Sequence, residues 1–415
     1  MLEQGTFMDG QPQKSQTVLA ERIPELDGLR GIAIGLVLLF HCFSPVLKGP
    51  LRTAFYPLIM AGRSGWTGVD LFFVLSGFLI GGILLDARNA TNYFHVFYAR
   101  RFFRIIPAYM ALLILYYAIC TVAAVADIRQ LQWDEAWVVP WYVPIFFVHN
   151  FWIVISRDLY PLSLGVLWSL SVEEQFYLTM PWLVKYLEPR RMLRVAIGGA
   201  LLAICLRLAA RAAMSIYPTY WSMLMPCRMD SLLLGFLGAV IWRDADWRGQ
   251  FARQKNLHRV LLILLAAGFA YFTWRPDQPR ERWGLSIGLT WAAALHFLFL
   301  MYALLHKEGI VGWVLRRGWL RWLGGIAYGV YLFHRLFLQT VASLVWHTSG
   351  DVEVKTTGQL LLYFLMFAAM LAFCRVLYVF YELPFLKLGH KVSYNFPKVC
   401  ARETQDAGEV MAGAR

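Results

Sequence analysis

Apolar runs separated by short polar loops fill most of this 415-residue chain. An α-helix rises about 1.5 Å per residue, so about 20 apolar residues cross the roughly 30 Å of bilayer hydrocarbon. The pattern predicts ten spans and therefore an all-α polytopic membrane bundle. The predicted spans lie near 31–47, 66–85, 105–125, 164–184, 195–213, 229–242, 260–274, 284–305, 325–346 and 358–380.

The runs form one membrane domain over residues 23–386, since no polar linker divides them. A polar segment precedes this domain at 1–22 and another follows it at 387–415, and we expect both to be cytoplasmic tails. The run from Trp141 to Ile155 is a candidate re-entrant or interfacial segment. Close helix packing is expected at three GxxxG pairs, Gly31/Gly35, Gly77/Gly81 and Gly325/Gly329.

Composition supports a membrane protein, because 59% of the residues are hydrophobic and only 16% are charged, against about a quarter charged in soluble proteins. The net charge of +13 is spread over short loops instead of one basic patch, which excludes nucleic acid as a partner.

About two thirds of the 39 lysine and arginine residues lie on the side of the N-terminus, so both termini are predicted to be cytoplasmic and the protein to reside in the plasma (inner) membrane. The six cysteines show neither disulfide nor metal-ligand spacing.

Arg30 and His41 are the most informative polar residues in the first span. They are eleven residues apart, about three helical turns, which predicts one common face and about 16.5 Å along the axis. Histidine near the bilayer midplane suits a general base, and arginine at the cytoplasmic interface suits phosphate. A structural hydrogen bond and positive-inside anchoring would explain the same residues.

Arg100, Arg101 and Arg104 open the third span, and Arg104 shares a face with each of the other two. They are candidates for an anion site that holds the phosphates of a nucleotide-like donor, with lipid headgroup anchoring as the alternative.

Carboxylates inside spans form a third group of candidates. Glu173 shares a helix face with Ser169 and Tyr177, and Asp70 lies in an otherwise apolar run. Either could orient a substrate or His41, and either could instead pair with a membrane arginine. Arg228 and Asp230 are expected to bond each other.

These motifs resemble the acyltransferase-3 family of membrane O-acyltransferases. The family's arginine, ten residues, histidine motif falls on Arg30 and His41, and its Arg-Arg-x-x-Arg motif on Arg100, Arg101 and Arg104. Further matches follow in order over Ile23 to Leu386: Gly68-Val-Asp-Leu-Phe-Phe-Val-Leu-Ser-Gly-Phe78, Trp168-Ser-Leu-Ser-Val-Glu-Glu-Gln-Phe-Tyr177, Arg228-x-Asp230, Tyr331-Leu-Phe-His334 and Glu382-Leu-Pro384.

The resemblance implies a cytoplasmic acyl-coenzyme A donor, most simply acetyl-coenzyme A, used as a substrate and not held as a permanent cofactor. It also implies a hydroxyl acceptor on a sugar, in a glycan, a lipid-linked precursor or a glycosylated small product. Because only a short tail follows Leu386, we expect a stand-alone member without a fused extracytoplasmic hydrolase-like domain. Homo-oligomerisation and a separate partner protein both stay open.

In the mechanism that the resemblance implies, His41 deprotonates the acceptor at the thioester end of the donor. Glu173 or Asp70 assists, and the four arginines hold the phosphates. A covalent acyl-histidine relay is the alternative order of events. A transporter or flippase is the alternative function, since helical transporters also bury charges, although they usually show two repeated halves and none is visible here.

Overall fold

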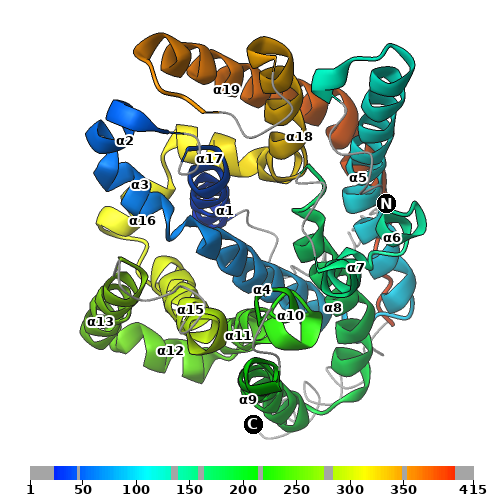
Figure 1. The fold of residues 1–415 in the computed structure, drawn as a ribbon. Helices are drawn as coiled ribbons and strands as arrows, with labels where there is room; N and C mark the ends of the chain where they lie inside the picture. Colours follow the sequence, from blue (N-terminus) through cyan, green and yellow to red (C-terminus); the bar gives the residue numbers. More distant parts are fainter. Residues whose placement is uncertain are drawn as a thin grey trace, which may run out of the picture.

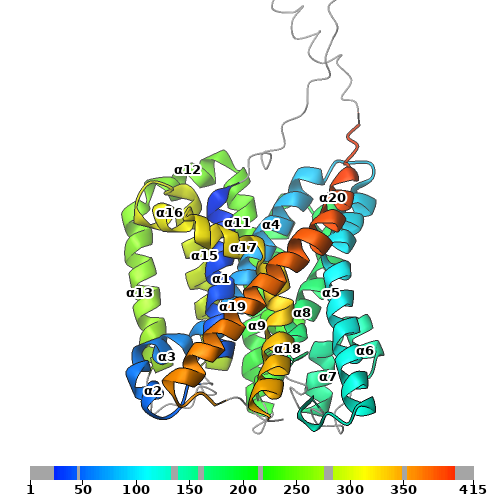
Figure 2. The same cartoon turned by 90° about the horizontal axis from the view of Figure 1, so that it is seen from above.

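A computed structural model describes residues 23–43, 47–131, 139–157, 163–213, 218–274, 284–347 and 353–397. Within these ranges the regular elements are helices, and one isolated bridge joins Leu47 to Val354. The predicted N-terminal tail at 1–22 lies outside the described residues. Figure 1 shows the helices around the central helix α4, and Figure 2 shows the same bundle turned by 90°.

A long helix falls on each of the ten predicted spans. The helices are α1 (Pro24–Leu38) with η1 (Leu39–Phe43), α4 (Gly68–Ala87), α5 (Tyr93–Val125), α8 (Leu167–Tyr186), α9 (Pro189–Ala213), α11 (Met225–Arg243), α13 (Lys255–Trp274), η5 (Gly284–Gly288) with α15 (Leu289–Leu305), α18 (Ala327–Trp346), and α19 (Thr357–Leu377) with η6 (Tyr378–Glu382) and α20 (Leu383–Lys391). Among the described residues, seven helical stretches are long and apolar enough to cross a membrane. The all-α polytopic membrane fold is therefore confirmed, and the exact number of spans stays a prediction.

Short helices cover the two ends of the bundle. At one end lie α2 (Gly49–Ala54), α3 (Tyr56–Gly62), α6 (Tyr142–Ile145) and α7 (His149–Ser156), and at the other lie α12 (Ala245–Arg253), α16 (Ile310–Leu315) and α20 (Figure 2). The segment from Trp141 to Ile155 thus forms two short helices beside α5. The remaining short elements are η2 (Gly65–Thr67), η3 (Arg129–Leu131), α10 (Pro218–Trp221) and α17 (Gly318–Gly325).

Close backbone contact holds α4 in the centre of the bundle. A Cβ atom on Gly77 would lie 1.9 Å from the carbonyl oxygen of Leu232, and one on Gly235 would lie 2.1 Å from that of Val74. Helices α4 and α11 therefore cross where only glycine fits, as the Gly77/Gly81 pair predicted. In each of the other two GxxxG pairs one glycine makes no close helix contact, because nothing lies within 4 Å of a Cβ on Gly35 or Gly325.

The chain continues in α20 past the domain boundary that was predicted at residue 386, as far as Lys391. The following residues pack back onto the start of α5. The side-chain amide of Asn92 donates to the carbonyl of Ser393 at 3.0 Å, and the amide of Thr91 donates to the carbonyl of Asn395 at 2.9 Å. The part of the predicted C-terminal tail that is described therefore belongs to the bundle.

The distribution of basic loops makes a testable prediction about orientation. A cysteine at Asp158, which follows α7 in the sequence and lies outside the described residues, is expected to react with a membrane-impermeant maleimide in intact cells. A cysteine at Asp246, exposed on α12 at the other end, is expected to react only after permeabilisation. The reverse pattern of labelling would contradict the predicted orientation.

Candidate active site

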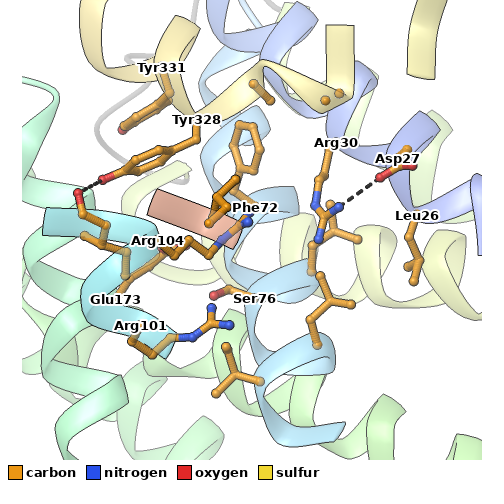
Figure 3. Close-up of a pocket in the computed structure, with 18 of the residues that line it drawn as sticks. Leu26, Asp27, Arg30, Phe72, Ser76, Arg101, Arg104, Glu173, Tyr328 and Tyr331 are labelled. Carbon is orange, nitrogen blue, oxygen red and sulfur yellow. Dashed lines mark hydrogen bonds and ion pairs between the residues drawn. The ribbon is translucent and has the colours of Figure 1, made fainter. Parts of the chain in front are cut away.

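A cavity of about 650 Å³ lies between α1, α4, α5, α8, α18 and the turn from η6 into α20. This volume is within the range of sites that bind small molecules, about 300–1,000 Å³. Apolar side chains of α4 line the cavity, together with charged side chains from α1, α5 and α8 (Figure 3). Glu382 of η6 lines it as well. The cavity brings together residues from both ends of the domain, from Ile23 to His390.

Three arginines that the sequence singled out meet in this cavity. Figure 3 shows the side chains of Arg30, Arg101 and Arg104 pointing toward one space beside Phe72 and Ser76. Arg30 forms an ion pair with Asp27 at 3.0 Å. Within the described part of the chain, no ion pair involves Arg101 or Arg104, and the buried Nε of Arg101 has no hydrogen-bond partner. Because unpaired buried cations are costly, this arrangement suits an anionic ligand.

Arg100, the third member of the predicted cluster, lies outside the cavity. Its Nε donates to the carbonyl of Val392 at 2.8 Å, and its guanidinium lies 5.1 Å from the ring centre of Tyr394. Arg100 and Arg101 are adjacent on α5, so they point about 100° apart and only one of them faces the cavity. Arg100 therefore holds the C-terminal segment in place, and the predicted three-arginine site is reduced to two of its members.

Glu173 enters the same cavity from α8. The hydroxyl of Tyr177 donates to its carboxylate at 3.2 Å, and Ser76 of α4 bonds to the same tyrosine hydroxyl. Since Tyr177 donates to Glu173, Ser76 is the donor in the second bond. Glu173 thus lies close to the arginine side of the site, and helices α4 and α8 are joined by a chain of three polar side chains.

Val69, Phe72, Ser169 and Tyr331 form another part of the cavity wall. The hydroxyl of Tyr331 bonds to Ser169 and donates to the carbonyl of Val166 at 3.1 Å. The ring of Phe72 packs edge-on against Tyr331 with centres 5.9 Å apart. These contacts join α4, α8 and α18 at this part of the wall.

His41 does not line the cavity, whereas Arg30 does. The α-helical part of the first span ends at Leu38, and His41 belongs to the π-helical turn η1, in which the repeat widens from i→i+4 to i→i+5. That the two side chains share one helix face stays a prediction. His41 faces α18, where its Nδ1 is 3.3 Å from Nε2 of His334.

Asp70 is also outside the cavity lining, in a buried ion pair. Its carboxylate is 3.1 Å from the guanidinium of Arg228 and accepts a hydrogen bond from Ser231 at 3.0 Å. The expected bond between Arg228 and Asp230 is not formed, since Asp230 pairs at 2.8 Å with Arg207, a residue of α9. Arg228 and Asp230 are two residues apart on α11 and point to different neighbouring helices, so each pairs across an interface.

Several residues of the cavity had not been selected from the sequence. Glu382 belongs to the π-helical turn η6, and Lys387 and His390 belong to α20 and add basic groups to the rim. Glu382 belongs to the Glu-Leu-Pro motif, so the sequence contained a signal that could have selected it. Lys387 and His390 were missed because the chain after residue 386 was treated as a tail.

The arrangement of basic groups around a membrane cavity agrees with a sequence comparison. A family model for an acyltransferase domain, acyltransferase-3, matches residues 23–379. The chain belongs to this family. It is 27% identical over 330 residues to the peptidoglycan O-acetyltransferase OatA of Listeria monocytogenes, which covers 75% of this chain and 49% of that protein.

A second relative is the O-acetyltransferase OatA of Staphylococcus aureus, with 26% identity over 396 residues, 91% of this chain and 59% of that protein. The chain thus spans about half to three fifths of the length of these relatives. No solved structure matches the chain.

The ion pair of Asp70 gives a prediction about stability. Asp70→Asn is expected to destabilise the protein by about 3–5 kcal/mol, because it leaves the buried Arg228 without its partner. Thermal unfolding of the detergent-solubilised protein measures the effect, and Asp246→Asn on the exposed α12 is the control. An Asp70→Asn protein that unfolds like the wild type and has lost acyl transfer would instead give this carboxylate a chemical role.

Proposed function

We propose that this protein is a membrane O-acyltransferase that moves an acyl group, most simply acetyl, from acyl-coenzyme A to a sugar hydroxyl. The observation that carries the proposal is the cavity in which Arg101 and Arg104 face a common space without an ion-pair partner among the described residues. A diphosphate or a 3′-phosphate supplies the acceptor oxygens that such guanidinium groups need. The family match and the acetyltransferase names of both relatives support acyl transfer over the transporter alternative.

In this proposal the donor enters from the cytoplasmic end. Arg101 and Arg104 bind its phosphates, Arg30 and Lys387 add positive charge nearby, and the pantetheine arm extends along the apolar wall formed by α4. The direction follows from the predicted orientation, since α20 and its basic residues lie at the end assigned to the cytoplasm.

His41 is the proposed general base. Its ring nitrogen takes the proton of the acceptor hydroxyl while the hydroxyl oxygen forms a bond to the thioester carbonyl carbon. The carbon–sulfur bond then breaks, and the thiolate leaves with the proton from the imidazolium. Because His41 does not line the cavity, the proposal requires side chains of the cavity wall, such as Phe72 and Tyr331, to turn aside for the thioester to reach it. Glu173, which already lines the cavity, is the residue we propose to orient the reacting groups.

The proposed acceptor is a sugar hydroxyl that approaches from the extracytoplasmic side of the plasma membrane. The name of the relative from L. monocytogenes specifies peptidoglycan as its substrate. We extend to this chain only the chemical class, a hydroxyl on a cell-surface glycan or its precursor.

The donor site is tested by a matched set of arginine variants. Arg101→Gln with Arg104→Gln is expected to weaken acetyl-coenzyme A binding at least about tenfold, because hydrogen bonds between charged groups contribute about 1.5–3 kcal/mol each. Arg100→Gln is the control on the same helix and is expected to leave the affinity unchanged, since Arg100 bonds to Val392. Isothermal titration calorimetry at low and high salt measures both effects. Equal affinities for the double variant and the control would remove the donor from this cavity.

The base is tested by His41→Gln, which keeps a hydrogen-bonding side chain and cannot accept the proton. We expect transfer to fall by about 10²–10⁴-fold while donor binding is retained. Release of coenzyme A in the presence of acceptor measures the rate. Transfer near the wild-type rate would exclude His41 as the base and direct attention to Glu173.

A further inference from the structure

His334 is completely buried on α18, and both of its ring nitrogens have a polar neighbour. Its Nδ1 lies 3.0 Å from the carbonyl oxygen of Val330 and 2.9 Å from that of Tyr331. Its Nε2 lies 3.3 Å from Nδ1 of His41, with ring centres 5.3 Å apart. The two rings therefore form a connected pair between α18 and the π-helical turn η1.

The carbonyl neighbours determine which nitrogen of His334 carries the proton. A carbonyl oxygen only accepts, so Nδ1 must be the protonated nitrogen that donates to the backbone of α18. In the neutral ring Nε2 then holds a lone pair. An acceptor at that position requires a donor opposite to it, and the donor is the Nδ1–H of His41.

We infer that His334 is a positioning residue that fixes His41 in the tautomer protonated at Nδ1 and leaves the Nε2 lone pair of His41 free to take a proton. The order of bonds is backbone carbonyl, His334, His41 and then the reacting hydroxyl. The same logic operates wherever a second group sets the tautomer of a catalytic imidazole. Without this partner, nothing among the contacts described for His41 would select the Nδ1–H form.

The packing of η1 explains why the partner lies on another helix. An ordinary α-helical histidine has backbone carbonyls of its own preceding turn nearby, as His334 does. His41 lies in the widened turn of η1, and the neighbouring Phe40 packs edge-on against it with ring centres 5.1 Å apart. Nδ1 of His41, the nitrogen that must carry the proton, thus has its partner on α18. The distance between α1 and α18 therefore decides whether this hydrogen bond forms.

This inference rests on the proposed function for its catalytic consequence, and the pairing itself can be measured without activity. Nitrogen-15 NMR of the full-length protein with labelled histidine, in lipid nanodiscs, distinguishes protonated from unprotonated ring nitrogens. His41 signals are assigned by their loss in His41→Gln. The wild type is expected to show a protonated Nδ1 and an unprotonated Nε2 at His41. A wild-type His41 protonated at Nε2 alone would overturn the inference with no variant required.

Two substitutions at His334 test the role of its acceptor. His334→Leu removes the acceptor and is expected to shift His41 toward the Nε2–H tautomer and to lower kcat by about 10²-fold or more, with donor affinity unchanged. His334→Gln places an amide oxygen near the former Nε2 and is expected to preserve the tautomer and to restore kcat to within about tenfold of the wild type. Equal losses of kcat in both variants, with an unchanged tautomer, would contradict a positioning role.

The matched control is His258→Leu, which also removes a buried histidine from a long helix. His258 lies on α13, where its ring neighbours His306 with centres 6.2 Å apart. This variant is expected to change neither the His41 tautomer nor kcat. If His41 shows the Nδ1–H tautomer and His41→Gln still transfers acyl groups at the wild-type rate, the pairing stands and the proposed base is wrong, so the two failures are distinct.

Discussion

The cost of placing a charge in hydrocarbon constrains this structure more than any other factor. Most of the ions inside the bundle, among the described residues, have a partner on another helix. Asp70 with Arg228 joins α4 to α11, Asp230 with Arg207 joins α11 to α9, and Asp86 with Arg243 again joins α4 to α11 at 2.6 Å. Removing either member of such a pair would leave the other buried and uncompensated, so the pairs specify which helices are neighbours. Arg101 and Arg104 face the cavity without an ion-pair partner among the described residues, and they make this part of the cavity basic.

The fold could be predicted from the sequence because hydrophobic length determines where a chain can cross a bilayer. Every predicted span coincides with a long helix. The first, third and fifth helices begin six or more residues before their predicted spans, at Pro24, Tyr93 and Pro189, and the tenth continues through α20 to Lys391. The first and third helices begin earlier because polar residues such as Arg30 and Arg101 continue them into the cavity. A span predicted from hydropathy ends where charged residues begin. The helix itself continues as long as its charged side chains have polar partners.

The candidate site was predictable in its residue types and less so in its geometry. Arg30, Arg101, Arg104 and Glu173 share one cavity, although the sequence could not decide between Arg100 and Arg101. Two π-helical turns, η1 and η6, are a further feature that the sequence did not predict. They carry His41 and Glu382, and a wide turn rotates all later side chains away from the positions that a regular helix predicts. Such turns recur at functional sites and leave no clear signal in a hydrophobic pattern.

The central claim is that the cavity binds the phosphates of an acyl-coenzyme A donor at Arg101 and Arg104, with its thioester directed toward Tyr331 and the His41–His334 pair. The most direct measurement is an electron cryomicroscopy structure of the protein in nanodiscs with a non-transferable acetyl-coenzyme A analogue. The account predicts phosphate density within hydrogen-bonding distance of both guanidinium groups and the thioether end of the analogue at Tyr331. An analogue bound elsewhere, or with its phosphates at the end formed by α2 and α3, would contradict it.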